Sequence, residues 1–468
     1  MDRTLSRLAG ALVVGAMAPL FDSTIVSVAL HSLAHDLHAP VATVQWVSTG
    51  YLLAAGVTVP VVGWLQRRVG GKRLWMSALV VFLVGSVLCS LAWSAGALVA
   101  ARVVQGVGAG AMLPLLTTLL MQAAGGKDLG RLMGVVSLPT ALGPILGPVV
   151  GGLILGAATW HWLFWVNVPF AVVGLVLAAR LMPADGPTTR PRLDVVGLLL
   201  LSPAVVGLLL GLSGVGEGGG LGRPAVWGPL VAGLVLLAAF VGWALRRRGE
   251  ALVDVRLLRH RPLATSASLL FLTGASLYGV MLLLPLSFQE LRATDALGAG
   301  LLLVPQGVGA LLSRTLAGRL NDRLGPRPVA VAGFLLLGLA TLPFAYAGPG
   351  TPVWWLVLVL LVRGVGLGAV TIPLMAVGFV GLARDEVPHA SIVTRISMQV
   401  GGAAGVAVLA VVLQDGLAVL PPLGAFQHAF GWAVGLTAAS VLLALVLPGR
   451  PRPATPVREA AQLEDASA

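Results

Sequence analysis

The sequence predicts an all-α protein that crosses a membrane many times, and three observations lead to this fold class. Hydrophobic residues make up 57% of the 468-residue chain, charged residues only 10%, and the mean hydropathy is +0.95. Apolar stretches recur along the chain, and Lys and Arg gather in alternate connecting segments. A soluble protein carries about 25% charged residues. The composition therefore excludes a soluble enzyme and a disordered chain.

Fourteen apolar stretches are long enough to cross a bilayer, for which a helix needs about 20 residues. The predicted spans are residues 8–30, 44–65, 74–93, 97–121, 132–156, 161–181, 195–213, 226–245, 263–288, 298–318, 329–347, 353–377, 388–413 and 426–447. The stretch Ala16-Met-Ala18 resembles a signal-peptide cleavage site, but the apolar run continues to Leu30. We therefore predict an uncleaved first span.

The basic residues predict the orientation of these spans. Of the 30 Lys and Arg residues, 24 fall in segments that share one side of the membrane, and only Arg223 and Arg292 fall on the other. The remaining four lie within spans: Arg102, Arg314, Arg363 and Arg395. The positive-inside rule then places both termini in the cytoplasm of a multi-pass protein of the cell membrane. The bias also explains the net charge of +12 without a nucleic-acid partner.

An internal repeat divides the chain. The loop Gly63-Trp-Leu-Gln-Arg67-Arg68-Val-Gly70-Gly-Lys72 aligns with Gly318-Arg-Leu-Asn-Asp322-Arg323-Leu-Gly325-Pro-Arg327, and Gly106-x-Gly108-x-Gly110 aligns with Gly364-x-Gly366-x-Gly368. Each later element follows its counterpart by eight predicted spans. We predict six-helix bundles at residues 1–182 and 263–447, two linker spans with a basic cytoplasmic segment at 183–262, and a cytoplasmic tail at 448–468. Within the linker, residues 246–262 carry six Arg and are predicted to form a surface helix.

Four motifs carry a resemblance to a known family. They are Asp22-Ser-Thr-Ile-Val-Ser-Val-Ala-Leu30 in the first span, the two Gly-x-Leu-x-x-Arg loops, Arg102-x-x-Gln105-Gly106-x-Gly108 in the fourth span, and Leu142-Gly143-Pro144-x-x-Gly147-Pro148-x-x-Gly151-Gly152 in the fifth. With them the chain resembles the 14-span drug:proton antiporters of the major facilitator superfamily. The resemblance implies two six-helix bundles with two inserted helices, export by alternating access, and no enzyme activity. Repeated halves of this kind usually rock around a site near the membrane midplane.

The sequence also departs from the pattern of that family. Ser27 and His31 stand where the first-span motif usually has Asn and Pro. The first cytoplasmic loop carries Arg67 where an Asp is common, whereas the second loop keeps Asp322. These differences weaken the expectation that a carboxylate of the first loop latches the gate.

Asp22 is the only carboxylate deep within a predicted span, and we predict that it carries the proton. An ionised carboxylate inside a membrane must be paired, wetted or protonated. Burial and a nearby cation shift the pKa of a carboxylic acid in opposite directions, so a group between these influences can bind and release a proton. Arg102 lies at a similar depth and is the expected partner. The alternative is that the two residues form a permanent structural ion pair.

Polar and aromatic side chains within the spans are the predicted substrate contacts. They are Gln45, Trp46, Tyr51, Gln289, Gln306, Arg363 and Arg395. An aromatic face with a few amides suits lipophilic molecules, and the arginines can meet anionic or electron-rich groups. For the amides and aromatics, ordinary helix or lipid packing is an equal alternative. Arg363 could instead cap carbonyls beside the glycine run, and Arg395 and Arg314 could extend to the cytoplasmic face.

The fifth span and the two repeated loops are the predicted moving parts. Gly143, Gly147 and Gly151 share one helix face, and Pro144 and Pro148 each remove a backbone donor. Together with Gly152 they predict a hinge or a seal, with ordinary tight packing as the alternative. The predicted cytoplasmic gate consists of Gly63, Arg67, Arg68, Gly70, Lys72, Gly318, Asp322, Arg323, Gly325 and Arg327.

Other activities find no support in the sequence. The chain has no phosphate-binding Gly-x-x-x-x-Gly-Lys-Ser/Thr loop, and its Gly106–Gly110 run lies inside an apolar span without a preceding strand. Its single cysteine excludes a disulfide within the chain and a cysteine-based metal site. His31, His35, Asp36 and His38 have the spacing of metal ligands, but a solvated outer loop is the preferred interpretation. We therefore expect no cofactor and no metal, with the proton gradient as the energy source.

The sequence as a whole predicts a proton-coupled exporter of lipophilic small molecules that works as a monomer in the lipid bilayer. Neutral, zwitterionic or monocationic substrates are expected. One alternative is an exporter dedicated to a single metabolite, such as an antibiotic or a peptide. Another is a membrane sensor or scaffold that transports nothing, in which Asp22→Asn would leave function intact.

Overall fold

The computed structural model is all-helical throughout the part of the chain that it describes. The described residues are 3–124, 132, 147, 150–186, 188, 192–214, 223–247, 251–294, 296–383 and 385–448. The first-half helices are α1 (Arg3–Asp36), α2 (Val41–Thr58), α3 (Val62–Val69), α4 (Gly71–Ser90), α5 (Ala95–Ala124), α7 (Trp162–Trp165) and α8 (Asn167–Leu181). The later helices are α9 (Val195–Gly214), α10 (Pro224–Arg246), α11 (Arg261–Arg292), α12 (Ala296–Leu324), α13 (Pro326–Thr341), α14 (Val353–Val377), α15 (Val387–Val419) and α16 (Pro422–Ala444).

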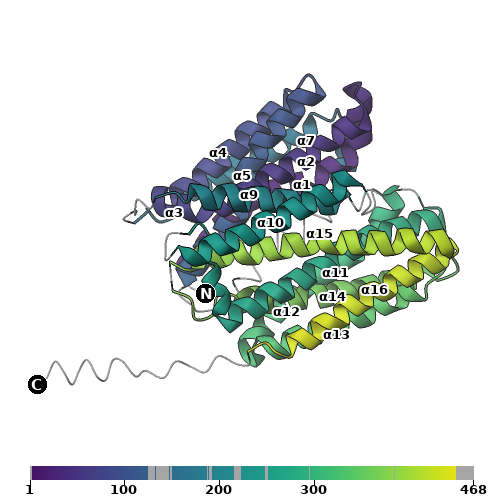
Figure 1. Cartoon of the computed structure of the whole chain (residues 1–468). Helices are drawn as coiled ribbons and strands as arrows, with labels where there is room; N and C mark the ends of the chain where they lie inside the picture. The colour runs from purple at the N-terminus through teal and green to yellow at the C-terminus, as the bar shows by residue number, and fades with distance from the viewer. Residues whose placement is uncertain are drawn as a thin grey trace, which may run out of the picture.

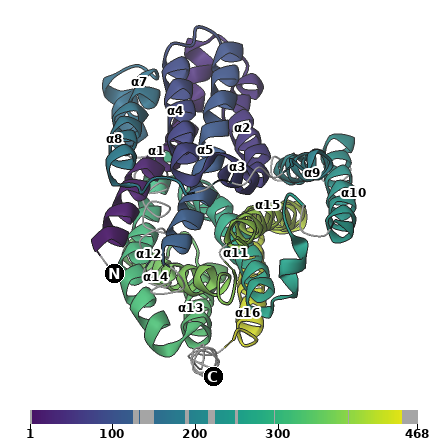
Figure 2. The same ribbon diagram turned by 90° about the vertical axis from the view of Figure 1, so that its left-hand side faces the viewer.

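The helices gather in two groups with a helix pair at their side. Figure 1 shows α1 to α5 in one group and α11 to α16 in the other. In Figure 2, α9 and α10 lie on the flank, where α9 packs against α10, α2 and α15. The two groups follow the division that the internal repeat predicts, and the exact domain boundaries stay predictions.

Corresponding helices of the two groups form corresponding pairs. In the first group α5 packs against α2 and α4, and α1 packs against α8. In the second group α14 packs against α12 and α13, and α11 packs against α16. The repeat in the sequence is therefore also a repeat in packing.

The two glycine runs allow this close packing. A Cβ on Gly108 of α5 would lie 2.6 Å from the backbone nitrogen of Phe82 in α4. In the same way, a Cβ on Gly366 of α14 would lie 2.7 Å from the backbone nitrogen of Leu337 in α13. Real Cβ atoms are not found at such distances, so only glycine lets these helix backbones approach. The runs thus serve helix packing.

Eleven described helices are long and apolar enough to cross a membrane, or twelve if the bent pair within α12 counts as one span. The apolar part of α9, Val195–Gly211, is shorter than the others. The predicted fifth span, residues 132–156, lies mostly outside the described residues. A polytopic helical membrane protein is thereby confirmed, and the count of fourteen spans stays a prediction.

The surface helix predicted for residues 246–262 is wrong. The described part forms a short 3₁₀ helix, Val255–Arg259, and α11 begins at Arg261. Buried Asp194, at the start of α9, accepts hydrogen bonds from the Leu252 backbone at 3.1 Å and from Trp243 Nε1 of α10 at 3.0 Å. This carboxylate draws the segment inward, so the arginines do not mark an amphipathic surface helix.

We expect Gly366→Ala to lower the Tm of the purified protein, because the added Cβ would meet the backbone of α13. Overpacking of this kind typically costs about 1–3 kcal/mol. Unfolding can be followed with a thiol-reactive fluorescent dye, because the single cysteine, Cys89, is buried in the fold.

The matched control is Gly435→Ala in α16, where a Cβ would meet nothing within 4 Å. This substitution should leave the Tm unchanged or raise it slightly, since Ala favours helix. An equal loss of Tm in both variants would contradict the packing role of Gly366.

Candidate functional site

A buried ion pair between Asp22 of α1 and Arg102 of α5 forms the centre of the first group. Nη1 of Arg102 donates to Oδ2 of Asp22, and the exposed fractions of the two residues are 1% and 0%. The sequence predicted these two residues as partners from their depth alone. The structure confirms that they meet.

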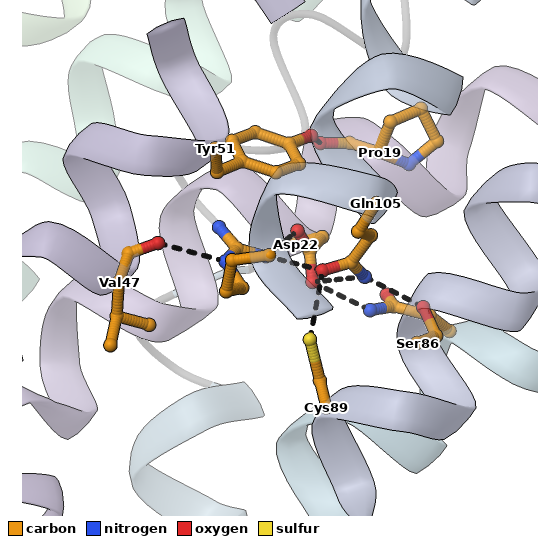
Figure 3. A network of polar contacts seen from close by, with 9 residues as sticks. Pro19, Asp22, Val47, Tyr51, Ser86, Cys89 and Gln105 are labelled. Atoms are coloured by element: carbon orange, nitrogen blue, oxygen red, sulfur yellow. Dashed lines mark hydrogen bonds and ion pairs between the residues drawn. The ribbon is translucent and has the colours of Figure 1, made fainter. Parts of the chain in front are cut away.

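The second carboxylate oxygen of Asp22 is also saturated with donors. Its Oδ1 accepts from Gln105 Nε2 at 3.1 Å and from Asn167 Nδ2 of α8 at 2.7 Å. Gln105 Nε2 in turn donates to Ser86 Oγ of α4 at 2.6 Å (Figure 3). Both carboxylate oxygens of Asp22 therefore accept hydrogen bonds.

The Arg102 guanidinium has several partners besides Asp22. Its Nε donates to the Val47 carbonyl at 3.0 Å, and Nη1 also donates to Gln105 Oε1 at 2.6 Å. The guanidinium carbon lies 4.0 Å from the centre of the Tyr51 ring, a cation–π contact. These neutral groups can hold the cation when its carboxylate partner is neutralised.

Tyr51 connects α2 to the same part of α1. Its hydroxyl donates to the Pro19 carbonyl at 3.1 Å, three residues before Asp22 (Figure 3). Pro19 lies inside α1 and removes one helix hydrogen bond there. Asp22, the predicted proton carrier, thus lies one turn after a position where α1 lacks a backbone hydrogen bond.

Asn167, Ser86 and Cys89 are members of this network that sequence reasoning missed. The Cys89 thiol lies 3.6 Å from Gln105 Oε1. Oδ1 of Asn167 is buried and has no hydrogen-bond partner among the described residues. Asn167 is an amide within an apolar stretch, so the sequence did contain a signal. Because the side chain is uncharged, it did not stand out from other neutral polar residues.

In the second group, Arg363 of α14 forms a polar cluster of its own. Its Nη1 donates to Gln306 Oε1 of α12 at 2.6 Å, and its Nε donates to Thr341 Oγ1 of α13 at 3.1 Å. These hydrogen bonds go to side chains and not to carbonyls beside the glycine run. The structure therefore brings together the predicted pair Gln306 and Arg363.

The other predicted substrate contacts lie in different surroundings. Half-buried Arg395 of α15 interacts electrostatically with Tyr51 of α2 and Tyr278 of α11, so it lies between the two groups. Trp46 is 50% exposed. Gln289 is exposed near the end of α11, and the side chain of Gln45 is outside the described part.

Arg314 was predicted to extend to the cytoplasmic face if it had no other role. In the structure Arg314 belongs to α12, and its side chain is buried.

The two repeated loops depend on glycine in the same place. Gly70 has a φ of +100° and Gly325 a φ of +88°, a region that favours glycine. Arg68, which follows Arg67 in α3, is exposed and stacks 5.3 Å over the Trp64 ring. Gly318, Asp322 and Arg323 lie in the last two turns of α12, and Arg327 lies in the first turn of α13.

An acidic residue from a distant part of the chain caps the helix that follows the first loop. Asp185, which follows α8, accepts from the Lys72 backbone nitrogen at 2.7 Å and from the Arg73 backbone nitrogen at 3.1 Å. These nitrogens belong to the first turn of α4, where a negative charge is favourable. The Lys72 ammonium also donates to the Met182 carbonyl at 2.8 Å.

Two hydrogen bonds join the halves near these loops. Arg67 Nη1 lies 2.7 Å from Nε2 of His389 in α15. Ser391 Oγ of α15 donates to the Pro114 carbonyl of α5 at 3.0 Å. Gly63 of the first loop packs here as well, since a Cβ added to it would lie 3.3 Å from the Cβ of Pro388.

Part of the fifth-span motif can be placed. Gly151 lies against α1, and a Cβ there would be 3.2 Å from the carbonyl of Ile25, one turn after Asp22. Gly147 is buried, and a Cβ on Gly152 would meet nothing within 4 Å. Gly143, Pro144 and Pro148 lie outside the described residues.

Comparison with known proteins identifies the class of protein. The family model of the Major Facilitator Superfamily matches residues 12–406, so the chain belongs to this superfamily. The fold agrees, because the structure of the human organic anion transporter MFSD10 (TETRAN) superposes with a TM-score of 0.68 at 18% identity, covering 95% of this chain and 100% of that one. The chain is a multi-pass membrane transporter and not an enzyme.

Relatives in sequence are named for drug resistance. The chain is 36% identical to "Multidrug resistance protein B homolog" of Mycobacterium tuberculosis, over 88% of this chain and 77% of the relative. It is 29% identical to "Lincomycin resistance protein LmrB" of Bacillus subtilis, over 86% of this chain and 85% of the relative. The chain is thus similar to multidrug-efflux members of the superfamily.

We expect Arg102→Gln to destabilise the protein by about 3–5 kcal/mol, since it leaves a buried carboxylate without its cation. The double variant Asp22→Asn/Arg102→Gln should be more stable than Arg102→Gln alone, because both charges are then removed. The Tm of each purified variant, read through the Cys89 thiol, checks this order. If the Tm change of the double variant equals the sum of the changes in Asp22→Asn and Arg102→Gln, the two residues do not act as a coupled pair.

Proposed function

We propose that this transporter exports lipophilic small molecules from the cytoplasm in exchange for protons, by alternating access. The observation that supports this most strongly is the fully buried Asp22, paired with Arg102 and saturated with donors. Within membranes, ionisable residues are costly and usually functional. The drug-resistance names of the relatives support the substrate class.

Protonation of Asp22 is the proposed coupling step. A proton on Oδ2 neutralises the carboxylate and removes the ion pair that links α1 to α5. Arg102 keeps its contacts with Val47, Gln105 and the Tyr51 ring, so the cation remains partnered. The proton therefore weakens the contact of α1 with α5, while the Arg102 cation keeps hydrogen-bonding and cation–π partners in the bundle.

The contacts of Arg67 with His389 and of Ser391 with Pro114 form the proposed cytoplasmic seal. The distribution of Lys and Arg supports placing this end, and both termini, in the cytoplasm. Opening toward the cytoplasm then requires these contacts between α15 and the first bundle to break. In this proposal the two bundles, residues 1–182 and 263–447, move against each other, and residues 183–262 follow.

Proton entry supplies enough energy for drug resistance. One charge that moves through 100 mV releases about 2.3 kcal/mol. Since a tenfold gradient requires about 1.4 kcal/mol, one proton sustains roughly a 50-fold gradient of a neutral substrate. The proposal therefore needs neither ATP nor a cofactor, and it treats the monomer as the working unit.

We expect Asp22→Asn to abolish substrate-induced proton release from inverted membrane vesicles, because an amide cannot take up the proton. The assay loads acidified vesicles, adds compounds from a panel of cationic and neutral dyes and antibiotics, and follows the internal pH with a fluorescent probe. The wild-type protein should release protons with at least one compound.

The matched control for this assay is Asp36→Asn, which removes an exposed carboxylate at the end of the same helix. It should release protons at the wild-type rate at equal expression. If proton release persists in Asp22→Asn, a residue other than Asp22 binds the transported proton. If the wild-type protein releases no protons with any compound, the result would oppose antiport.

Arg67→Ala should open the proposed cytoplasmic seal more often. Loss of a hydrogen bond worth about 1 kcal/mol shifts an equilibrium about fivefold. The measurement is the rate of maleimide labelling of Ala390→Cys in a Cys89→Ser background, because Ala390 is buried and lies between the two contact residues of α15, His389 and Ser391. Arg68→Ala, which removes an exposed arginine of the same helix, is the control. Equal labelling rates with and without Arg67 would refute the seal.

A further inference from the structure

The Arg363 cluster repeats part of the Asp22 site at the corresponding place in the second half. Gln105 and Arg363 each precede the first glycine of a Gly-x-Gly-x-Gly run. Gln105 donates to Ser86 of α4, and Arg363 donates to Thr341 of α13. Both hydroxyl residues lie 16 positions after the positive-φ glycine of their loop. The two clusters are therefore equivalent in the repeat.

Gln306 continues this equivalence. It lies 12 residues before Gly318, as Tyr51 lies 12 residues before Gly63. Tyr51 interacts electrostatically with Arg395 of the second half. Gln306 thus occupies the helix position that corresponds to Tyr51, and like Tyr51 it is buried, with an exposed fraction of 8%.

The second cluster lacks the carboxylate of the first. Among the described residues, the buried acidic side chains are Asp22 and Asp194, and neither belongs to the second half. In α11, the counterpart of α1, the one acidic residue is Glu290, which is exposed near the end of the helix. Arg363 therefore has no acidic partner in the described part of the chain.

The hydrogen bonds of Arg363 leave one nitrogen of its guanidinium without a partner in the described part of the chain. The side chain is 0% exposed, and Nη2 has no hydrogen-bond partner among the described residues. Thr341 holds Nε in place, because its hydroxyl accepts from Arg363 and donates to the Leu337 carbonyl at 2.7 Å. A buried, oriented cation without a counter-ion is costly unless an anion joins it. A guanidinium matches the two oxygens of a carboxylate.

We propose that Arg363, oriented by its hydrogen bonds to Thr341 and Gln306, binds a monovalent anionic group of the transported substrate. The inference rests on the proposed export function and extends its substrate class to lipophilic molecules that carry a carboxylate. A free inorganic anion such as chloride offers the same charge, so the experiment separates the two sources.

The test measures ligand-induced changes in Tm of the purified full-length protein in sodium sulfate, which contains no monovalent anion, read through the Cys89 thiol. The probes are 1-naphthylacetate and 1-naphthylacetamide, which share their ring and differ in charge, and sodium chloride in place of sulfate. Naphthylacetate should raise the Tm of the wild-type protein, since a ligand stabilises the state that binds it. Naphthylacetamide should have a much smaller effect.

In Arg363→Gln, we expect the half-saturating concentration of naphthylacetate to rise about tenfold or more, as for the loss of a charged hydrogen bond. Arg363→Lys keeps the charge but not the planar guanidinium, so its half-saturating concentration should lie between those of the wild-type protein and Arg363→Gln. This variant also replaces Arg363→Gln in the test if the Gln variant does not fold. Arg314→Gln is the control, because it removes another buried cation of the same half. Its response to naphthylacetate should match that of the wild-type protein.

Equal responses to the acid and the amide, or a naphthylacetate response that survives Arg363→Gln, would overturn the proposal. A chloride response that requires Arg363, without a naphthylacetate response, would overturn the assignment to substrate and identify an inorganic-anion site. The binding assay uses no proton gradient. Loss of proton release in vesicles with an intact, Arg363-dependent naphthylacetate response would therefore count against the antiport proposal alone.

Discussion

The ion pair of Asp22 with Arg102 is the interaction on which the first half of the molecule depends. Two charges buried in an apolar bundle need each other and need their remaining hydrogen-bonding groups filled. The surrounding helices meet this need in turn, since α2 supplies a carbonyl, α4 a hydroxyl and α8 an amide. Five helices, α1, α2, α4, α5 and α8, thus meet at one ion pair and the hydrogen bonds around it.

The sequence was sufficient for the overall architecture and for the charged centre, for physical reasons. Apolar length and the bias of basic residues report directly on membrane crossing, and the repeated loops identify equivalent helices. Charged residues within spans are rare, so Asp22 and Arg102 stand out without a structure. Neutral groups such as Ser86 and Asn167 do not, because hydroxyls and amides occur throughout membrane helices in purely structural roles.

What the sequence could not supply was pairing between distant segments. The arginines at 246–262 are typical of a surface helix, and only the structure shows that Asp194 draws this segment inward. Likewise, Gln306 had ordinary packing as an equal alternative, and Arg363 could instead have capped carbonyls beside the glycine run. Their contact depends on how α12 and α14 pack around the glycine run, and no local pattern contains that information.

The capping of α4 by Asp185 has a consequence for recombination between relatives. Here the charge that caps α4 comes from the connection after α8, at the end of the first bundle. A chimera that joins residues before this connection to the remainder of a homologue would separate the cap from the helix it serves. Crossover points after residue 186 keep the pair together, and with it the geometry of the loop.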